Sequence, residues 1–164
     1  MAAVDLAGLL RCLEVTETTP GSWTAPNLEM DYHRIFGGQL LAQAVMLATA
    51  TADDRTVRSL GCLFPREGSL EKPFAFEIES SHTGRTFATR RISAEQAGRP
   101  FFLAQASLHV SEGGPEHQEQ APDVGDPIDA EPEDMSMIPW ETRVVGAVDL
   151  RDRAAGPAEY AFWT

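Results

Sequence analysis

A glycine pair that leads directly into a long apolar stretch constrains this chain more than any other feature. Gly37 and Gly38 open the stretch, which ends near Ala48. Apolar residues recur through it at helical spacing, whereas two glutamines and Met46 spread over the other side. Those apolar residues are Leu40, Leu41, Ala44, Val45, Leu47 and Ala48. Because much of the circumference is apolar, we expect a helix over residues 36–48 that other elements must enclose.

The sequence after this helix alternates with the two-residue period of β-strands. Strands are predicted over residues 56–64, 73–80, 86–95 and 101–110. Short turns separate them, and Gly84 is expected to supply a positive φ in one of these turns. Such short connections favour consecutive antiparallel pairing. The predicted fold class is therefore α+β, with a curved antiparallel sheet wrapped around a long central helix.

The remaining segments divide the chain into a core domain and a tail. A short amphipathic helix over residues 5–13 and a hairpin of short strands precede the central helix, so the core domain is expected to span residues 1–110. Residues 111–135 hold nine acidic residues and no Lys or Arg, which is typical of a flexible loop or linker. Residues 136–164 are expected to form terminal strands. These strands either return to the sheet or lead into a missing further domain.

Charge and cysteine content exclude several functions. The formal net charge of -12 argues against nucleic-acid binding, which needs clustered Lys and Arg. No stretch approaches the length of a membrane-spanning helix, so we expect no membrane insertion. The two cysteines, Cys12 and Cys62, are not arranged as a disulfide framework or a zinc site. Reduced thiols indicate a cytoplasmic protein, and we expect neither a metal nor a cofactor.

The glycines at the helix start admit two interpretations. They could let a ligand approach backbone N–H groups at the positive end of the helix dipole. Alternatively, the sheet presses on the helix there and leaves no room for side chains. His33 and Arg34 lie just ahead and could reach the same pocket, although a histidine in this position is more often a cap or a surface residue.

Other polar residues have simpler expected roles. Gln43 and Gln105 are amides within apolar patterns, and a hydrogen-bonded core amide is the commoner explanation for each. Arg85, Arg90 and Arg91 cluster around a turn. Cross-strand pairing with the acidic residues of the preceding strand explains this cluster more simply than phosphate binding does.

Three segments of the chain resemble the acyl-CoA thioesterase II family (TesB-like), whose members join two hotdog folds in one chain. The resemblance rests on residues 34–44, 84–91 and 100–107 and on their spacing, and it covers about residues 13–110. It implies that this region is the N-terminal hotdog half, with the central helix surrounded by the sheet. The sequence departs from the family pattern at Gly61, where His is usual, and at Glu67, where Pro is usual. The family's catalytic Asp, hydroxyl residue and Gln lie in a second half, so the resemblance places no catalytic residue here.

The resemblance implies hydrolysis of fatty acyl-CoA to a fatty acid and CoA. The expected partners are the acyl-CoA substrate and a second hotdog domain, supplied by a homodimer or by a C-terminal half. We expect His33, Gly37, Gly38 and Gln39 to form the substrate-binding wall. The alternative hypothesis is a non-catalytic hotdog homodimer that binds acyl-CoA or acts as a dimerisation scaffold. Whether the chain is an enzyme by itself is left open, because the implied triad lies outside it.

Overall fold

The computed structural model describes residues 4–30, 32–135, 138–147, 149, 152, 156 and 159–164. These residues form two compact units. The larger unit is Ala7–Gly113, and the smaller one contains the described residues of Met1–Leu6 and Gly114–Thr164.

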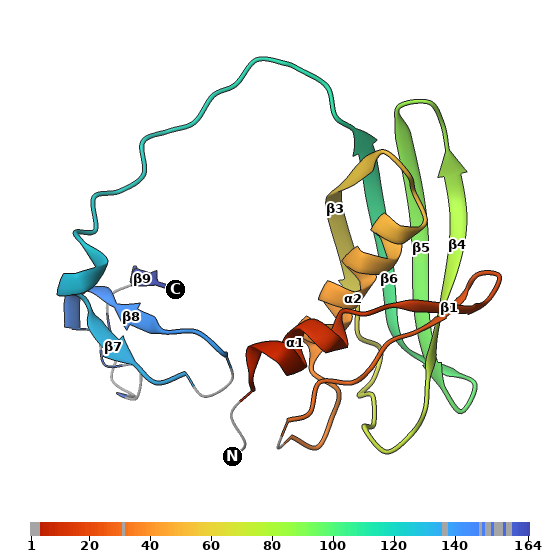
Figure 1. Ribbon diagram of the computed structural model, residues 1–164, viewed down its shortest axis with the longest axis horizontal. Coiled ribbons are helices and arrows are strands. Elements are labelled where there is room, and N and C mark those ends of the chain that lie inside the picture. The colour runs from red at the N-terminus through yellow and green to blue at the C-terminus, as the bar shows by residue number, and fades with distance from the viewer. Residues whose placement is uncertain are drawn as a thin grey trace. The chain divides into compact units, whose positions relative to one another are not determined.

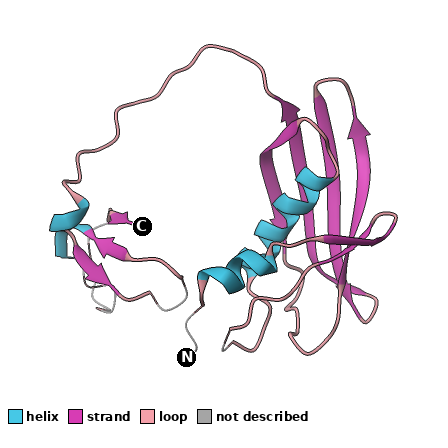
Figure 2. Ribbon diagram, in the orientation of Figure 1, coloured by secondary structure: helices cyan, strands magenta, loops and turns pink. Residues whose placement is uncertain are grey.

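The larger unit consists of one long helix packed against one antiparallel sheet (Figures 1 and 2). The helix is α2 (Gly37–Ala50), and the shorter helix α1 (Leu6–Cys12) precedes it. The sheet has six strands in the order β1 (Thr16–Thr19), β2 (Ser22–Thr24), β4 (Ala75–Thr83), β5 (Phe87–Gln96), β6 (Arg99–Val110) and β3 (Arg55–Leu63). Every neighbouring pair is antiparallel. This architecture confirms the predicted α+β class.

The core lies between α2 and the inner face of the sheet. Leu40, Ala44 and Leu47 of α2 are buried there. On β5, every second residue from Ala88 to Ala94 is buried, as the strand period requires. Ile92 lies opposite Ile78 of β4 and Ala104 of β6. Alternation along the central strands therefore gives the sheet one face against the helix and one face away from it.

The structure covers α2 differently from the prediction: one apolar part of the helix is exposed, and a polar part is buried. Val45 and Met46 are exposed, although the sequence placed Val45 with the apolar residues. Gln39 and Gln43 are buried instead, because the chain before the helix covers their side of α2. The helix is thus covered by the sheet and by the N-terminal segment, and part of its surface remains open.

The two predicted turns around β5 differ in their backbone geometry. Ala97 and Gly98 join β5 to β6 with φ values of 51° and 70°, as a two-residue hairpin turn requires. Gly84, between β4 and β5, has no positive φ, so that prediction was wrong. A Cβ atom there would lie 2.8 Å from Nε2 of His82. The exposed His82 side chain therefore occupies the place of a side chain at this glycine.

The smaller unit contains a three-stranded antiparallel sheet of β7 (Glu131–Glu133), β8 (Thr142–Val144) and β9 (Phe162–Trp163). Two 3-10 helices, η1 (Pro127–Asp129) and η2 (Val145–Ala147), accompany the strands. Residues 111–126 contain no helix or strand. Regular structure begins at residue 127, within the loop predicted over residues 111–135. The Asp126 side chain accepts a hydrogen bond from the Ile128 N–H at the start of η1, and β7 pairs with β8. Parts of the strands predicted between residues 138 and 163 lie outside the described residues.

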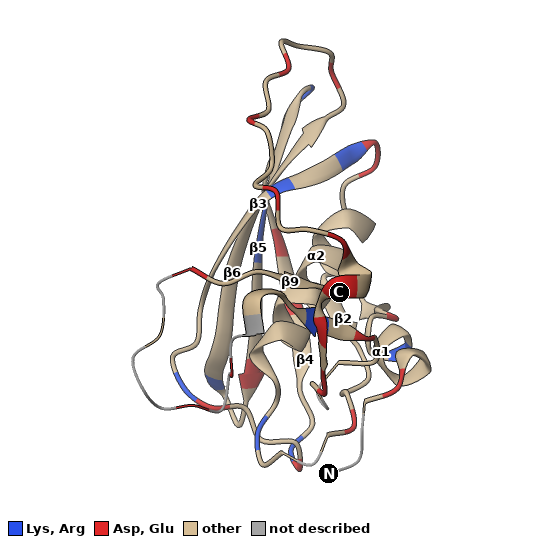
Figure 3. Ribbon diagram, turned by 90° about the vertical axis from the view of Figure 1, so that its left-hand side faces the viewer, with Lys and Arg blue, Asp and Glu red and all other residues tan. Residues whose placement is uncertain are grey.

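Lys and Arg positions are scattered over several elements of the chain (Figure 3). Within the described residues, every helix is too short or too polar to cross a membrane.

Candidate functional site

A cavity of about 340 Å³ lies beside the start of α2. Its buried lining is apolar and comes from Ile35, Leu40 and Phe101. Gly37 and the exposed ring of Phe64 line it as well, and the polar lining residues are Arg34, Arg66 and Glu67. The cavity can therefore hold an apolar group against the helix start while charged side chains meet the polar remainder of a ligand.

Backbone and side-chain contacts hold the cavity walls together. The N–H of Ile35 donates to the Gly68 carbonyl over 2.9 Å, which joins the segment before α2 to the segment after β3. Arg34 pairs with Glu67 and also lies over the Tyr32 ring. Arg66 donates to the Pro100 carbonyl over 2.7 Å. The charged side chains of the cavity thus come from two separate stretches of the chain, and the Pro100 carbonyl of a third stretch holds Arg66.

Aromatic rings press on both glycines of the helix start. A Cβ atom on Gly38 would lie 2.6 Å from the Phe36 ring, and one on Gly37 would lie 3.3 Å from the tip of the Phe64 ring. The packing interpretation is therefore supported, but the pressing groups are these rings and not the sheet strands. Gly37 also lines the cavity, so close packing and access for a ligand coincide at this residue.

The first turn of α2 has polar groups available for a ligand. The N–H groups at the beginning of a helix have no acceptor within it. Phe36 occupies the N-cap position and makes no side-chain capping hydrogen bond. The N–H groups of Gly37, Gly38 and Gln39 are therefore able to bind a carbonyl oxygen or an anion near the cavity.

The other predicted site residues have distinct positions. His33 is exposed and its ring contacts Tyr32, with 4.8 Å between the ring centroids. Gln39 is buried, and its side chain accepts from the Leu28 N–H and donates to Oδ1 of Asn27, each over 2.9 Å. The Gln39 side chain therefore fixes the segment before the helix and does not point into the cavity as a free amide.

Gln43 has the structural role that the sequence favoured. Its Nε2 donates to the Cys12 carbonyl over 2.7 Å and to the Pro26 carbonyl over 2.9 Å. Gln105, in contrast, is exposed on β6. The expectation of a buried amide was wrong there, because strand alternation places Gln105 on the sheet face away from α2.

The arginine cluster divides between the two faces of the sheet. Arg91 pairs with Glu79 over 3.0 Å on the outer face, as predicted. Arg90 is 3% exposed and lies on the inner face, so cross-strand pairing was the wrong expectation for it. Its guanidinium donates to the carbonyls of Thr51 and His82 and to hydroxyl groups. Burial, followed by the nearby charge of Arg55, lowers the pKa of Arg90.

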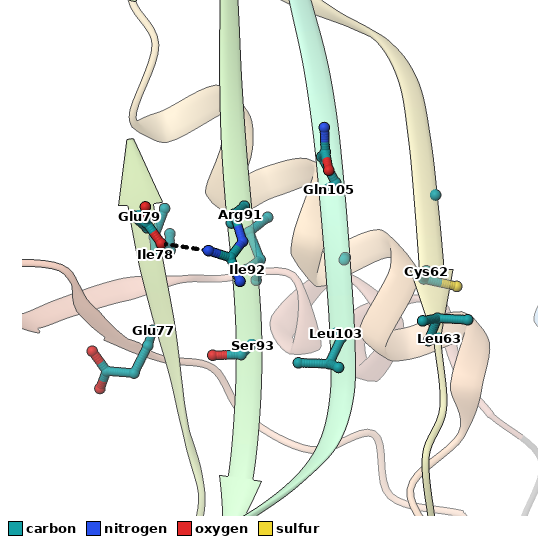
Figure 4. Close-up of a pocket in the computed structure, with 12 residues that line it drawn as sticks. Cys62, Leu63, Glu77, Ile78, Glu79, Arg91, Ile92, Ser93, Leu103 and Gln105 are labelled. Carbon is teal, nitrogen blue, oxygen red and sulfur yellow. Dashed lines mark hydrogen bonds and ion pairs between the residues drawn. The ribbon is translucent and has the colours of Figure 1, made fainter. Parts of the chain in front are cut away.

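A larger hollow of about 670 Å³ lies over the outer face of the sheet (Figure 4). It includes the Arg91–Glu79 pair, Glu77 and Gln105, and both members of that pair are well exposed. Gly61 also lines it, and a Cβ atom added there would have no neighbour within 4 Å. The lining of this hollow mixes exposed charged side chains with apolar ones, whereas the smaller cavity has three buried apolar walls beside the helix start. We therefore place the candidate site at the helix start.

Sequence reasoning missed most of the cavity lining. Ile35, Phe64 and Phe101 come from three segments that the local pattern does not bring together. The one local signal for Phe64 was its place as an aromatic residue at the end of the strand predicted over residues 56–64. Its contact with Gly37 depends on where the edge strand ends relative to α2.

The helix and sheet define the class to which the protein belongs. A hot dog fold protein from Alicyclobacillus acidocaldarius has a similar structure, with a TM-score of 0.65 and 19% identity over 84% of this chain and 55% of that one. At this identity the likeness concerns the fold alone. The protein is therefore a hotdog-fold protein.

A family model described as acyl-CoA thioesterase N-terminal domain matches residues 25–109. The chain belongs to the acyl-CoA thioesterase II family and contains its N-terminal hotdog domain. It is 34% identical to mouse acyl-coenzyme A thioesterase 8 over 134 residues, which are 76% of this chain and 42% of the relative. The tesB protein of Mycobacterium avium subs paratuberculosis has a TM-score of 0.76 and 27% identity, over 86% of this chain and 55% of that one. The chain thus spans about half the length of these relatives or less.

Proposed function

We propose that this chain supplies one wall of an acyl-CoA thioesterase site, which hydrolyses fatty acyl-CoA to a fatty acid and CoA once a second hotdog completes it. The observation that carries the proposal is the apolar cavity beside the first turn of α2. Burial of apolar surface stabilises an acyl chain in such a cavity. The nearby N–H groups suit the thioester carbonyl, and the arginines beside the cavity suit the phosphates of CoA.

The proposed reaction is an acyl transfer to water. The water oxygen bonds to the thioester carbon, the carbon–sulfur bond breaks, and the proton from water passes through a base to the CoA thiolate. The N–H groups of Gly37 and Gly38 stabilise the negative oxygen that forms in between. Among the described residues that line the cavity, the one carboxylate is Glu67, which is paired with Arg34. We therefore assign the base to the second hotdog.

His33 and Gln39 have supporting parts in this proposal. Gln39 presents its backbone N–H to the site, while its side chain fixes Asn27 and Leu28. His33 is exposed next to Tyr32 and Arg34, so we assign it to the polar part of CoA outside the cavity. A cytoplasmic location, expected from the two free thiols, stays a prediction.

The second hotdog is proposed to join at β3. This strand is the last in the sheet order and pairs only with β6 among the described strands. Leu63 at its end is 68% exposed. An edge strand presents unpaired N–H and carbonyl groups that can pair with another strand. The partner is either a second copy of this chain or a C-terminal half, and both place a second wall beside the cavity.

Thiol release from a medium-chain acyl-CoA, followed with a chromogenic thiol reagent, tests the proposed reaction. We expect the chain alone to bind a non-hydrolysable acyl-CoA thioether without turning over the thioester. Addition of a C-terminal hotdog should start turnover. Brisk turnover by the chain alone would instead show that two copies build the site. Absence of thioether binding in calorimetry, with and without the second hotdog, would overturn the proposal.

The open edge of β3 also favours a second candidate, a non-catalytic homodimer that binds acyl-CoA or acts as a scaffold. The exposed aromatic residues Tyr160 and Phe162, which stack on each other, add apolar surface in the smaller unit. Sedimentation of the chain with and without acyl-CoA distinguishes the candidates. A stable dimer that remains inactive with any added C-terminal hotdog would favour the scaffold.

A further inference from the structure

We propose that Phe64 determines which acyl-chain lengths the cavity accepts. This inference rests on the proposed function, because it assigns the acyl group to the cavity beside α2. It adds a specificity-determining residue that neither the sequence pattern nor the family resemblance identified.

Phe64 lies between the edge of the sheet and the start of the helix. It follows directly after β3, which ends at Leu63. Its ring centroid is 5.4 Å from that of Phe102, which is fully buried. On the other side, the ring tip approaches the position of a Gly37 Cβ atom to 3.3 Å. One aromatic ring thus spans from the core of the sheet to the first residue of α2.

The ring differs from the rest of the apolar lining in being exposed. Ile35, Leu40 and Phe101 are at most 5% exposed, whereas Phe64 is 47% exposed. Close-packed core side chains cannot yield without disturbing the fold. A ring that is half exposed to solvent is less constrained by its neighbours. Phe64 is therefore the apolar lining residue whose substitution should cost the least stability.

The position of the ring relates it to the acyl chain. Gly37 lines the cavity and supplies one of the N–H groups assigned to the thioester carbonyl. An acyl chain that starts at this carbonyl and enters the cavity must pass the Phe64 ring, which touches the same glycine position. The ring also lies next to the open edge of β3. Truncation of Phe64 should therefore lengthen the cavity toward that edge.

The test compares the full chain with Phe64→Ala in binding a series of non-hydrolysable acyl-CoA thioethers of increasing chain length. Each methylene that gains a buried position should tighten Kd by about fourfold. We expect Phe64→Ala to move the best-bound length upward by several carbons and to tighten the longest chains by about tenfold or more relative to the unmodified chain. Phe64→Trp should move the preference toward shorter chains.

Phe87→Ala is the matched control, because Phe87 is 55% exposed and does not line the cavity. Its length profile should equal that of the unmodified chain. Circular dichroism checks that each variant is folded, and Phe64→Leu replaces Phe64→Ala if the latter is not. An unchanged profile in folded Phe64 variants that still bind acyl-CoA would overturn this inference alone. Loss of acyl-CoA binding in every protein, including the unmodified chain, would overturn the proposed function as well.

Discussion

The two ends of α2 differ in how their backbone groups are satisfied. At the C-terminal end, the Thr51 hydroxyl donates to the carbonyls of Leu47 and Ala48, and buried Arg90 donates to the Thr51 carbonyl. At the N-terminal end, Phe36 offers no side-chain cap and Gly37 lines a cavity. Unsatisfied backbone groups are costly when buried. The contrast agrees with a C-terminal end that stabilises the fold and with the proposal that the N-terminal end binds a ligand.

A cation at the C-terminal end agrees with the direction of the helix dipole. Arg90 is buried, and burial together with Arg55 lowers its pKa. The carbonyl and hydroxyl oxygens around the guanidinium compensate for its desolvation. At the opposite end, the positive end of the same dipole favours a carbonyl oxygen or an anion. One helix thus provides both a fixed structural contact and a candidate binding surface.

Replacement of Arg90 should have the largest effect on unfolding free energy. Arg90→Met would leave the carbonyls of Thr51 and His82 without their donor, so we expect unfolding free energy to fall by about 3 kcal/mol. Arg91→Met is the matched control, and loss of its exposed pair with Glu79 should cost less than about 1 kcal/mol. Urea denaturation measures both. Equal losses in the two variants would show that Arg90 does not anchor the helix end.

Removal of the Gln43 amide tests how the middle of α2 is attached to the chain segment before it. Gln43→Leu would leave the carbonyls of Cys12 and Pro26 without a donor, and we expect a loss of about 2 kcal/mol in unfolding free energy. The exposed amide of Gln105 provides the control, since Gln105→Leu should change stability by no more than about 0.5 kcal/mol. A stable Gln43→Leu variant would argue that water replaces the amide.

Gly37→Ala tests the packing at the N-terminal end. The added methyl group would meet the Phe64 ring, so we expect a loss of about 0.5–1 kcal/mol in unfolding free energy. In a Phe64→Ala background this loss should disappear, which a double-mutant cycle detects. Gly61→Ala, which adds a methyl group into open space, should show no coupling to Phe64. If the effects of Gly37→Ala and Phe64→Ala on unfolding free energy were additive, they would contradict a contact between the two residues.

Replacement of Cys12 should have the smallest effect on unfolding free energy. Burial raises the pKa of its thiol above the ordinary value of about 9. The folded state therefore holds the proton more tightly than the unfolded state does, and the stability gained from this difference is complete below pH 9 and declines as pH rises further. Comparison of Cys12→Ala with the unmodified chain between neutral pH and pH 10 isolates this contribution. A pH dependence identical in both proteins would contradict it.

The helix and strands of the larger unit could be predicted because their signals are local. The apolar spacing between Leu40 and Ala48 and the alternation in residues 73–80 and 86–95 predict elements that the structure contains. The motif residues also led to the correct family. Strand β7 lies within the acidic segment, where composition favoured a loop and where pairing with β8 decided the outcome.

The candidate site was predicted only in part. The glycine pair identified the helix start, and Gly37 does line the cavity. Side-chain orientation could not be derived in the same way. Gln39 binds the preceding segment, and Gln105 faces away from α2, because neighbouring elements determine which polar groups find partners. Gly84 has no positive φ, and the His82 side chain lies where its Cβ atom would be.

The sequence by itself determined the class of the fold, the central helix with its glycine start and the family, since periodicity and short motifs are properties of neighbouring residues. Only the tertiary structure decided that Phe64 presses on Gly37, that Arg90 is buried at the far end of α2, and which segments form the cavity. The physical reason is distance along the chain. Contacts such as Gly37 with Phe64 or Arg90 with Thr51 join residues that come together only when the sheet packs on the helix.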